Sequence, residues 1–273
     1  MTAQLAVTGT ITGAGVAALL KGQISGLTLS NASGDAEHDI DIAAGAVGDT
    51  TQAEIMHLSA AITKRIDAAW QVGSGNGGLD TGAVAATTLY AVHLIRRSDT
   101  GVVDALFSTA FDKASITLPT NYDQSQLIGA VVTDSSSNII AFTHVGDYFL
   151  YTGDVIQDIN DSTITSNTFE TGSLSVPPNC LAHVYANATN SGETGGVARV
   201  AVRTVGASND IVGAESMAFI DIGATAPDGV GTNGFVLVDG SSQVEYGTVE
   251  TAGTANVQVR TRGFFMLTRG GGS

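Results

Sequence analysis

Apolar and polar residues alternate along much of the chain, and this period of two predicts β-strands. The stretches Thr88–Arg96 and Val102–Ser108 are rich in β-branched and aliphatic residues and flank the polar segment Arg97–Gly101. A second pair, Leu127–Val132 and Asn138–Thr143, is separated by a serine-rich segment. Because short polar segments between two such stretches are typical of hairpin loops, we expect both pairs to form antiparallel hairpins.

The segment from Met56 to Trp70 fits two periods. Its even positions are mostly apolar, as in a half-buried strand, but Leu58, Ile62, Ile66 and Trp70 also recur with the spacing of a helix. We interpret the segment as a strand, because the neighbouring segments are themselves predicted to be strands.

The last third of the chain predicts a further series of short strands: Val197–Val205, Ala218–Ile222, Phe235–Val238, Gln243–Val249 and Asn256–Leu267. Short strands at such spacing, separated by Gly, Asn, Asp and Ser, are typical of antiparallel sandwiches and barrels. A parallel α/β fold would instead alternate strands with helices. We therefore expect an all-β protein built of antiparallel, jelly-roll-like β-sandwich domains.

Two shifts in composition divide the chain. Residues 1–26 are rich in Gly, Ala and Thr and weakly patterned, which indicates an extended arm that becomes ordered on a partner. The stretch 153–171 is polar and precedes a new series of strands. We therefore expect an N-terminal attachment arm at 1–26 and two β-sandwich domains, at 27–152 and 153–273.

Composition and charge exclude several classes of function. The 26 Asp and Glu residues outnumber the 11 Lys and Arg residues, for a net charge of −15, which argues against a nucleic-acid-binding protein. The first basic residue is Lys21, and no apolar run near it approaches the roughly 20 residues of a membrane span. We expect no membrane insertion, and a protein that is made and kept in a cytoplasm until it is assembled or released. Cys180 is the only cysteine, so an intrachain disulfide is excluded and a buried structural role is expected.

The charges are unevenly distributed. Between Lys113 and Arg199 the chain holds eight acidic residues and no basic residue. The last third carries Arg199, Arg203, Arg260, Arg262 and Arg269. An acidic middle and an arginine-bearing end would either attract one another across subunits or form separate solvated faces, and the sequence leaves both alternatives open.

Several motifs resemble catalytic or cofactor sites only locally. Two Asp-Thr-Gly triplets, at 80–82 and 99–101, match aspartic proteases, but triplets so close in sequence are better explained as turns. The run Gly73–Gly78 has the spacing of a dinucleotide-binding fingerprint, yet another turn follows it rather than a helix, so we interpret it as a surface loop. His93 shows no metal-ligand spacing and is expected to pack in a strand. We expect no enzymatic activity and no cofactor.

Two weaker patterns indicate binding. Glu37, Asp39 and Asp41 would share one face of a strand, where three carboxylates could hold Ca²⁺, although such a row is also typical of an exposed edge strand. Tyr185 and Tyr246 lie near Asn and Asp residues. Exposed aromatic rings of this kind can stack on sugars, so both tyrosines are candidate contacts for a glycan.

The most distinctive part of the chain lies between Ile55 and Phe142, in the segments Ala61–Trp70, Gly73–Gly82, Tyr90–Ile95, Gly101–Ser108, Leu118–Pro119 and Ile128–Val131. The Gly-Asn-Gly-Gly-Leu-Asp-Thr-Gly run and the Val-Asp-Ala-Leu-Phe-Ser strand are its most specific elements. Together these segments resemble a module of tailed-bacteriophage virion proteins, which comprise tail-fibre, head-fibre and minor structural proteins. The resemblance implies a β-rich virion appendage, assembled as a homotrimer, and it implies no catalytic residues.

This resemblance leads to one functional hypothesis and two alternatives. We expect a non-enzymatic virion structural protein, a short trimeric tail fibre or spike that contributes to host-surface attachment and docks on other virion proteins through the arm at 1–26. The first alternative is a capsid-bound head fibre or decoration protein that stabilises the shell, which the short chain without long repeats favours. The second is a polysaccharide-degrading tailspike enzyme, which would require a long, repetitive β-helix.

Overall fold

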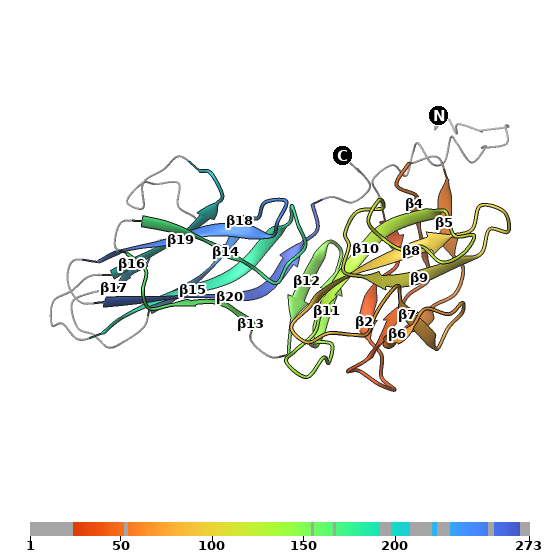
Figure 1. Cartoon of the computed structure of the whole chain (residues 1–273), viewed down its shortest axis with the longest axis horizontal. Coiled ribbons are helices and arrows are strands. Elements are labelled where there is room, and N and C mark those ends of the chain that lie inside the picture. Colours follow the sequence, from red (N-terminus) through yellow and green to blue (C-terminus); the bar gives the residue numbers. More distant parts are fainter. Residues whose placement is uncertain are drawn as a thin grey trace, which may run out of the picture.

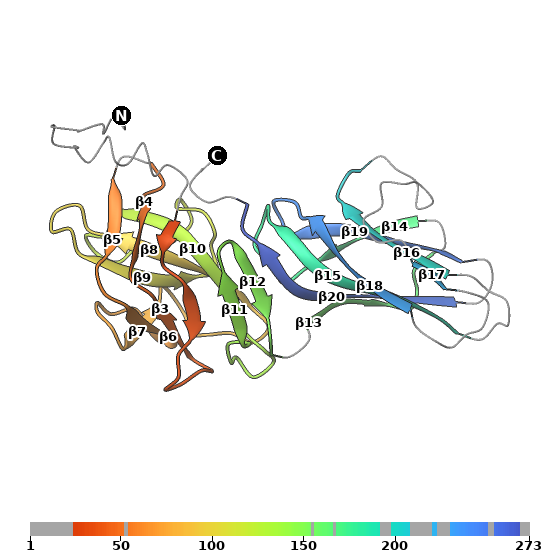
Figure 2. The ribbon, with the colours of Figure 1, turned by 180° about the vertical axis from the view of Figure 1, so that it is seen from behind.

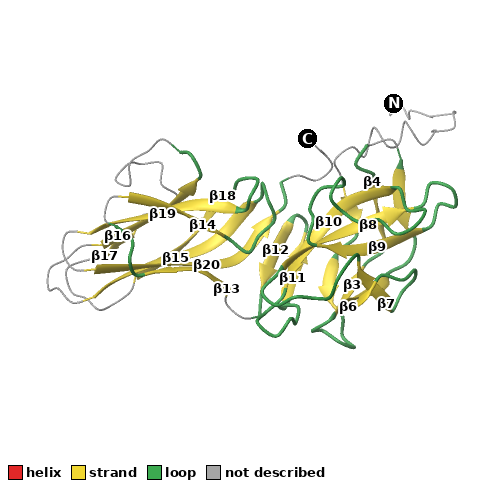
Figure 3. Ribbon diagram, viewed as in Figure 1, coloured by secondary structure: helices red, strands yellow, loops and turns green. Residues whose placement is uncertain are grey.

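The computed structural model describes residues 24–51, 54–153, 156–165, 168–191, 198–207, 220–222, 230–250 and 254–267. Within these ranges the secondary-structure elements are all β-strands, and there is no helix (Figure 3). The all-β class predicted from the sequence is therefore confirmed. The strands form four sheets, two before residue 133 and two after residue 141. Figures 1 and 2 show the two pairs of sheets side by side, with the hairpin of β11 and β12 between them.

The N-terminal half contains a small sheet and a large one. The small sheet has the order β1-β4-β5, with β1 (Ile24–Gly26), β4 (Gly45–Gly48) and β5 (Ile55–Leu58). The large sheet has the order β10-β8-β9-β7-β6-β3-β2. Its strands are β2 (Leu29–Asn31), β3 (Asp39–Ile42), β6 (Ile62–Ala69), β7 (Asn76–Leu79), β8 (Leu89–Arg96), β9 (Val103–Ser108) and β10 (Gln124–Val132).

The large sheet is not wholly antiparallel, because β7 pairs in parallel with both β6 and β9. A β-carbon at Gly77 would overlap the backbone oxygen of Ala69, so only glycine lets β7 lie this close to its neighbour. The expectation of a purely antiparallel architecture is therefore wrong at this point. The predicted surface loop over Gly73–Gly78 is also wrong in its second half, which belongs to the strand.

The C-terminal half consists of two sheets that share a core. One has the order β11-β12-β20-β15-β18, with β13 also paired to β20. Its strands are β11 (Phe142–Val145), β12 (Tyr148–Tyr151), β13 (Ile156–Asp161), β15 (Leu181–Ser191), β18 (Val230–Leu237) and β20 (Thr254–Phe265). The other has the order β14-β19-β16-β17, with β14 (Thr168–Ser173), β16 (Ala198–Thr204), β17 (Ile220–Ile222) and β19 (Gln243–Glu250). Buried side chains from both sheets, such as Val184 and Val202, meet in one cluster, as in a β-sandwich.

The β11–β12 hairpin connects the two halves. Phe149 of β12 pairs with Phe264 of β20, and their rings stack with centroids 4.7 Å apart. On the other side, the backbone N–H of Leu29 in β2 donates to Nδ1 of His144 in β11 at 3.0 Å. One buried cluster therefore runs from β2 to β20. The predicted domain boundary after residue 152 falls between β12 and β13, and it stays a prediction.

Most strand predictions are confirmed, and one of the two predicted hairpins is shorter than expected. β8 and β9 form the first predicted hairpin, and β5 and β6 both lie in the ambiguous segment 56–70. The second predicted hairpin forms only at its tip, where Thr133 bridges Ile139 and the backbone N–H groups of Asp134 and Ile140 donate to the carbonyls of Asn138 and Val132, both at 2.8 Å. Beyond this tip the second arm separates from the first, and Phe142 begins the strand that pairs with β12.

The predicted N-terminal arm lies almost entirely outside the described residues, which begin at Ile24. Its last three residues form β1, which pairs with β4. This end of the predicted arm is therefore part of a sheet, and the rest stays a prediction.

Candidate functional site

The outer surface of the six-stranded sheet carries exposed apolar side chains. Alternate residues of its strands, such as Phe149, Val184 and Phe264, are buried inside the sandwich, which leaves their neighbours on the outer side. The strand register aligns these neighbours in two adjacent rows. We call this group the aromatic face, and its members are Tyr148, Leu181, His183, Phe235, Leu237 and Phe265.

The rings of the aromatic face contact one another. Tyr148 stacks on Phe265 with centroids 4.4 Å apart, and His183 stacks on Phe235 at 4.8 Å. Phe235 in turn meets Phe265 edge-on at 5.7 Å. The hydroxyl of Tyr148 lies 2.6 Å from Nδ1 of His183, so these two polar groups form a hydrogen bond with each other. Four strands thus supply one continuous cluster of rings.

The aromatic face contains no acidic, lysine or arginine side chain among its six members, and the charge of Arg262 acts on Tyr148 and His183 from beside it. Partial burial lowers the pKa of His183, and the neighbouring Arg262 lowers it further. Burial also raises the pKa of Tyr148. Phe235 is 45% exposed and Leu237 is 43% exposed. A cluster of exposed apolar side chains without charge is typical of a surface that contacts another macromolecule.

The two tyrosines predicted to touch a glycan lie in different sheets. Tyr185 is in β15, on the same outer side as His183, and its ring lies 5.9 Å from the Arg260 guanidinium. Tyr246 is in β19 and is only 7% exposed, and its hydroxyl donates to Oδ2 of Asp161 at 3.1 Å. The expected exposure of Tyr246 is wrong, because its hydroxyl bonds inside the sandwich. A glycan contact at Tyr185 stays a prediction.

A second group, buried rather than exposed, brings together segments that carry the phage-like resemblance. Nζ of Lys64 in β6 lies 3.3 Å from Oδ1 of Asp104 in β9, and the two side chains are 0% and 2% exposed. Nζ also donates to the carbonyls of Gln71 at 2.6 Å and Gly73 at 3.3 Å. The N–H of Gly73 donates to Oδ2 of Asp104 at 2.8 Å. This ion pair therefore ties the loop after β6 to β9.

Aromatic rings enclose the ion pair. Trp70 places its ring centroid 5.4 Å from Nζ of Lys64, and its Nε1 donates to the carbonyl of Ala105 at 3.0 Å. Tyr122 meets Trp70 edge-on at 5.1 Å. Burial lowers the pKa of Lys64, which the carboxylate of Asp104 partly opposes. We call Lys64, Asp104, Trp70 and Tyr122 the lysine cluster.

The ion pair of the lysine cluster belongs to no recognisable sequence motif, because its two residues lie 40 positions apart, at Lys64 and Asp104. The sequence does contain one indication of a buried lysine. Lys64 lies between Ile62 and Ile66 on the side of the predicted strand whose other residues are apolar. When that side of the strand is buried, a charged side chain on it needs a partner of opposite charge.

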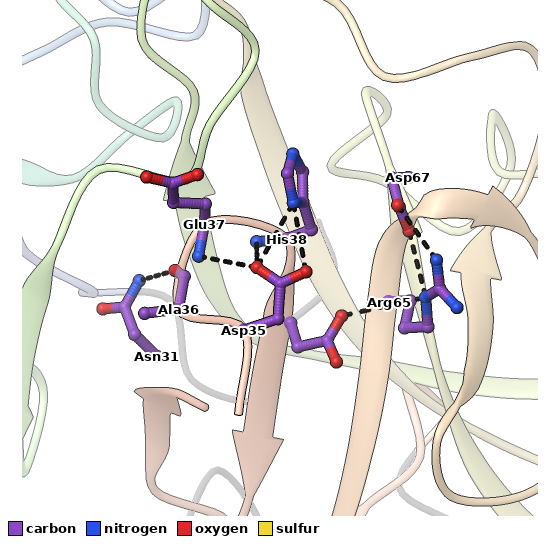
Figure 4. Close-up of polar contacts among 8 residues, drawn as sticks. Asn31, Asp35, Ala36, Glu37, His38, Arg65 and Asp67 are labelled. Atoms are coloured by element: carbon purple, nitrogen blue, oxygen red, sulfur yellow. Dashed lines mark hydrogen bonds and ion pairs between the residues drawn. The ribbon is translucent and has the colours of Figure 1, made fainter. Parts of the chain in front are cut away.

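The candidate calcium residues do not form a three-carboxylate site. Glu37 lies in a turn before β3, and Figure 4 shows its carboxylate directed away from Asp35. In β3, Asp39 faces Arg65 at 3.9 Å, and Asp41 accepts a hydrogen bond of 2.6 Å from a threonine of β6. Burial raises the pKa of Asp39. Within the described ranges, no three His, Cys, Asp or Glu side chains are arranged to hold a metal ion.

Local ion pairs lie in this turn and in the neighbouring strand β6 (Figure 4). Asp35 accepts from the backbone N–H of His38 at 3.2 Å and lies within 3.2 Å of its Nδ1. Arg65 donates to Asp67 at 3.0 Å from NH2 and 3.2 Å from Nε. Exposed pairs of this kind order a surface turn and contribute little stability.

The remaining sequence motifs have structural roles. Gly82 and Gly101, the last residues of the two Asp-Thr-Gly triplets, both have φ of +75°, so the prediction of turns is confirmed. His93 is 2% exposed, with Nε2 at 2.9 Å from the carbonyl of Ala110, as a packed strand residue would be. Cys180 is also buried, and burial raises its pKa to about 12, which makes the thiol unreactive.

Comparisons with known proteins leave the site to be interpreted from its own geometry. No protein-family model matches the chain, and no curated protein matches it either. The part of the chain that the structure describes contains no helix long and apolar enough to cross a membrane.

Proposed function

We propose that the chain is a non-enzymatic structural protein of a bacteriophage virion, a short homotrimeric tail fibre or spike that contributes to attachment at the host surface. The resemblance to phage virion proteins supports this role. The segments that carry the resemblance are also in contact in the fold, where they meet around the lysine cluster. A dense set of paired strands also suits a particle that must persist outside the cell without disulfides, since Cys180 is the only cysteine.

We also propose a jelly-roll topology for residues 156–265. A jelly roll winds eight strands through two Greek keys into two facing sheets. The order β13-β20-β15-β18 in one sheet and β14-β19-β16-β17 in the other has the expected alternation, in which the first strand pairs with the last and the second with the seventh. Jelly rolls are common in viral capsid and lectin domains, which supports a virion protein.

The aromatic face is the observation that carries the proposal, because an apolar surface on a regular sheet needs a partner. Its composition is that of an interface core, with aromatic and leucine side chains and no charge. Its two polar groups, on Tyr148 and His183, bond to each other at 2.6 Å and so do not serve the hydroxyls of a sugar. We therefore assign this face to contacts between copies of the chain around a three-fold axis.

Substitution in the aromatic face tests the assembly. Phe235→Asp places a carboxylate where the proposed subunits meet, and we expect the trimer dissociation constant to rise at least about tenfold, since interface aromatics commonly contribute more than about 1.4 kcal/mol. Val72→Asp is the matched control, because Val72 is 56% exposed but lies in a loop of the other half. Mass photometry over a concentration series measures both variants. A wild-type chain that stays monomeric at micromolar concentration would contradict the homotrimer.

The position on the particle tests the virion role. Cryo-electron microscopy of intact phage, with antibody labelling of this chain, should show three copies for each appendage on the tail. Density on the capsid would replace the tail fibre with a capsid-bound fibre or decoration protein. A soluble monomer that is absent from particles and hydrolyses polysaccharide would contradict both structural roles.

A further inference from the structure

The lysine cluster holds an amine and a carboxyl group together, buried from solvent. Nζ of Lys64 and Oδ1 of Asp104 lie 3.3 Å apart, and neither side chain is more than 2% exposed. This contact holds Nζ beside the carboxyl group whose carbon, Cγ, it would attack, and fixing two reacting groups in this way can raise their effective concentration to on the order of 10⁵–10⁸ M. We propose that Lys64 and Asp104 condense to an intramolecular isopeptide bond, which links β6 to β9 covalently. This site is independent of the proposed virion role.

The reaction balances without any other reagent. Transfer of one proton from the ammonium of Lys64 to the carboxylate of Asp104 gives a neutral amine and a neutral acid. The lone pair of Nζ then attacks Cγ, and the new C–N bond forms as the hydroxyl group leaves with a second nitrogen proton. The products are one amide and one water, and nothing is oxidised or reduced.

Burial favours the neutral form of the amine, which this reaction needs. The fully buried position of Lys64 lowers its pKa, because the ammonium loses hydration. Desolvation opposes a buried ion pair, whereas an amide carries no net charge and needs only hydrogen-bonding partners. The enclosed site also excludes the bulk water that would hydrolyse the product.

The surroundings already match the hydrogen bonds of the amide product. The carbonyl of Gln71, 2.6 Å from Nζ, accepts the single N–H that remains after condensation. The N–H of Gly73, 2.8 Å from Oδ2, donates to the oxygen that remains on Cγ. Both partners of the amide are thus present before the bond forms, so condensation requires little rearrangement of the loop.

The bond would give this chain a cross-link that its single cysteine cannot provide. β6 and β9 are not direct neighbours in the sheet, because β7 lies between them. A covalent link across β7 restricts the unfolded chain in the way that a disulfide does. It would also resist reducing conditions, which break disulfides.

Intact-mass spectrometry of the denatured full chain tests the proposal. We expect wild-type protein, purified folded, to be lighter than its sequence by one water, and tandem spectra to show a branched peptide joining Lys64 to Asp104. After unfolding, an amine-acylating reagent should modify Lys21 and Lys113 but leave Lys64 unmodified. A full-mass wild-type chain in which Lys64 is acylated would overturn the proposal.

Two variants complete the experiment. Asp104→Ala should show the full mass of its own sequence, and a shortfall of one water in this variant would also overturn the proposal. Lys113→Met is the matched control, since it removes a different lysine and should retain the shortfall. The wild-type and Lys113→Met measurements decide the matter even where Asp104→Ala fails to fold.

Discussion

Asp158 is a buried acidic residue whose carboxylate is satisfied by specific partners. Asp158 in β13 accepts hydrogen bonds from the backbone N–H of Ser175 at 3.1 Å and from its hydroxyl at 2.6 Å, as well as from the hydroxyl of Thr261. Burial nevertheless outweighs these bonds and raises the pKa of Asp158 above 3.8. The sandwich therefore holds a carboxyl group whose protonated form is favoured more in the folded chain than in the unfolded chain.

This difference makes stability depend on pH. A carboxyl whose pKa is raised by folding stabilises the folded state fully below its unfolded pKa, near 3.8, and that contribution is lost as the pH rises through the folded pKa. Asp158→Asn mimics the protonated form, so we expect its free energy of unfolding, relative to wild type, to increase from pH 4 towards pH 7. Urea denaturation across this range measures the difference. Glu37→Gln, which removes an exposed carboxylate, should show no such trend.

At the scale of elements, apolar patterns along the sequence predict strands, and they miss a strand that is held in place by close packing of backbones. β19 and β20 alternate apolar and polar residues, whereas β8 and β9 are mainly apolar and are buried on both faces; both patterns are typical of strands, so all four were predictable. β7 was not, because Asn76, Gly77 and Gly78 supply no apolar alternation. Its place in the sheet is set by its neighbours, which bury three of its four residues.

Because the backbone of β7 packs closely against that of β6, even a small side chain at Gly77 should destabilise the fold. Gly77→Ala would drive a β-carbon into the backbone oxygen of Ala69, so we expect it to lower the free energy of unfolding by about 1–3 kcal/mol. Gly34→Ala is the control, because its β-carbon meets nothing within 4 Å, and it should be neutral or stabilising by up to about 1 kcal/mol. Chemical denaturation monitored by Trp70 fluorescence compares the two. Equal effects of the two substitutions would contradict the proposed packing constraint.

At the scale of the whole molecule, the candidate sites depend on strand order that sequence periodicity does not contain. The aromatic face takes residues from β12, β15, β18 and β20, and only their lateral pairing places Tyr148 beside Phe265 and His183. The lysine cluster likewise joins Lys64 to Asp104 across an unpredicted strand. Local alternation indicates which residues face a core, whereas pairing decides which of them meet.

Net charge gives the proposed assembly a definite salt dependence. Each copy carries −15, so copies repel one another, and this repulsion is screened as the Debye length falls from about 10 Å at 0.1 M salt to about 3 Å at 1 M. If the uncharged aromatic face holds the trimer, added NaCl should lower the dissociation constant. Arg203, one of the arginines of the last third, is already paired within its own chain, with Glu245 at 2.6 Å. Sedimentation at increasing NaCl measures the effect, and a trimer that dissociates with salt would instead indicate contacts between acidic and arginine-bearing surfaces of different subunits.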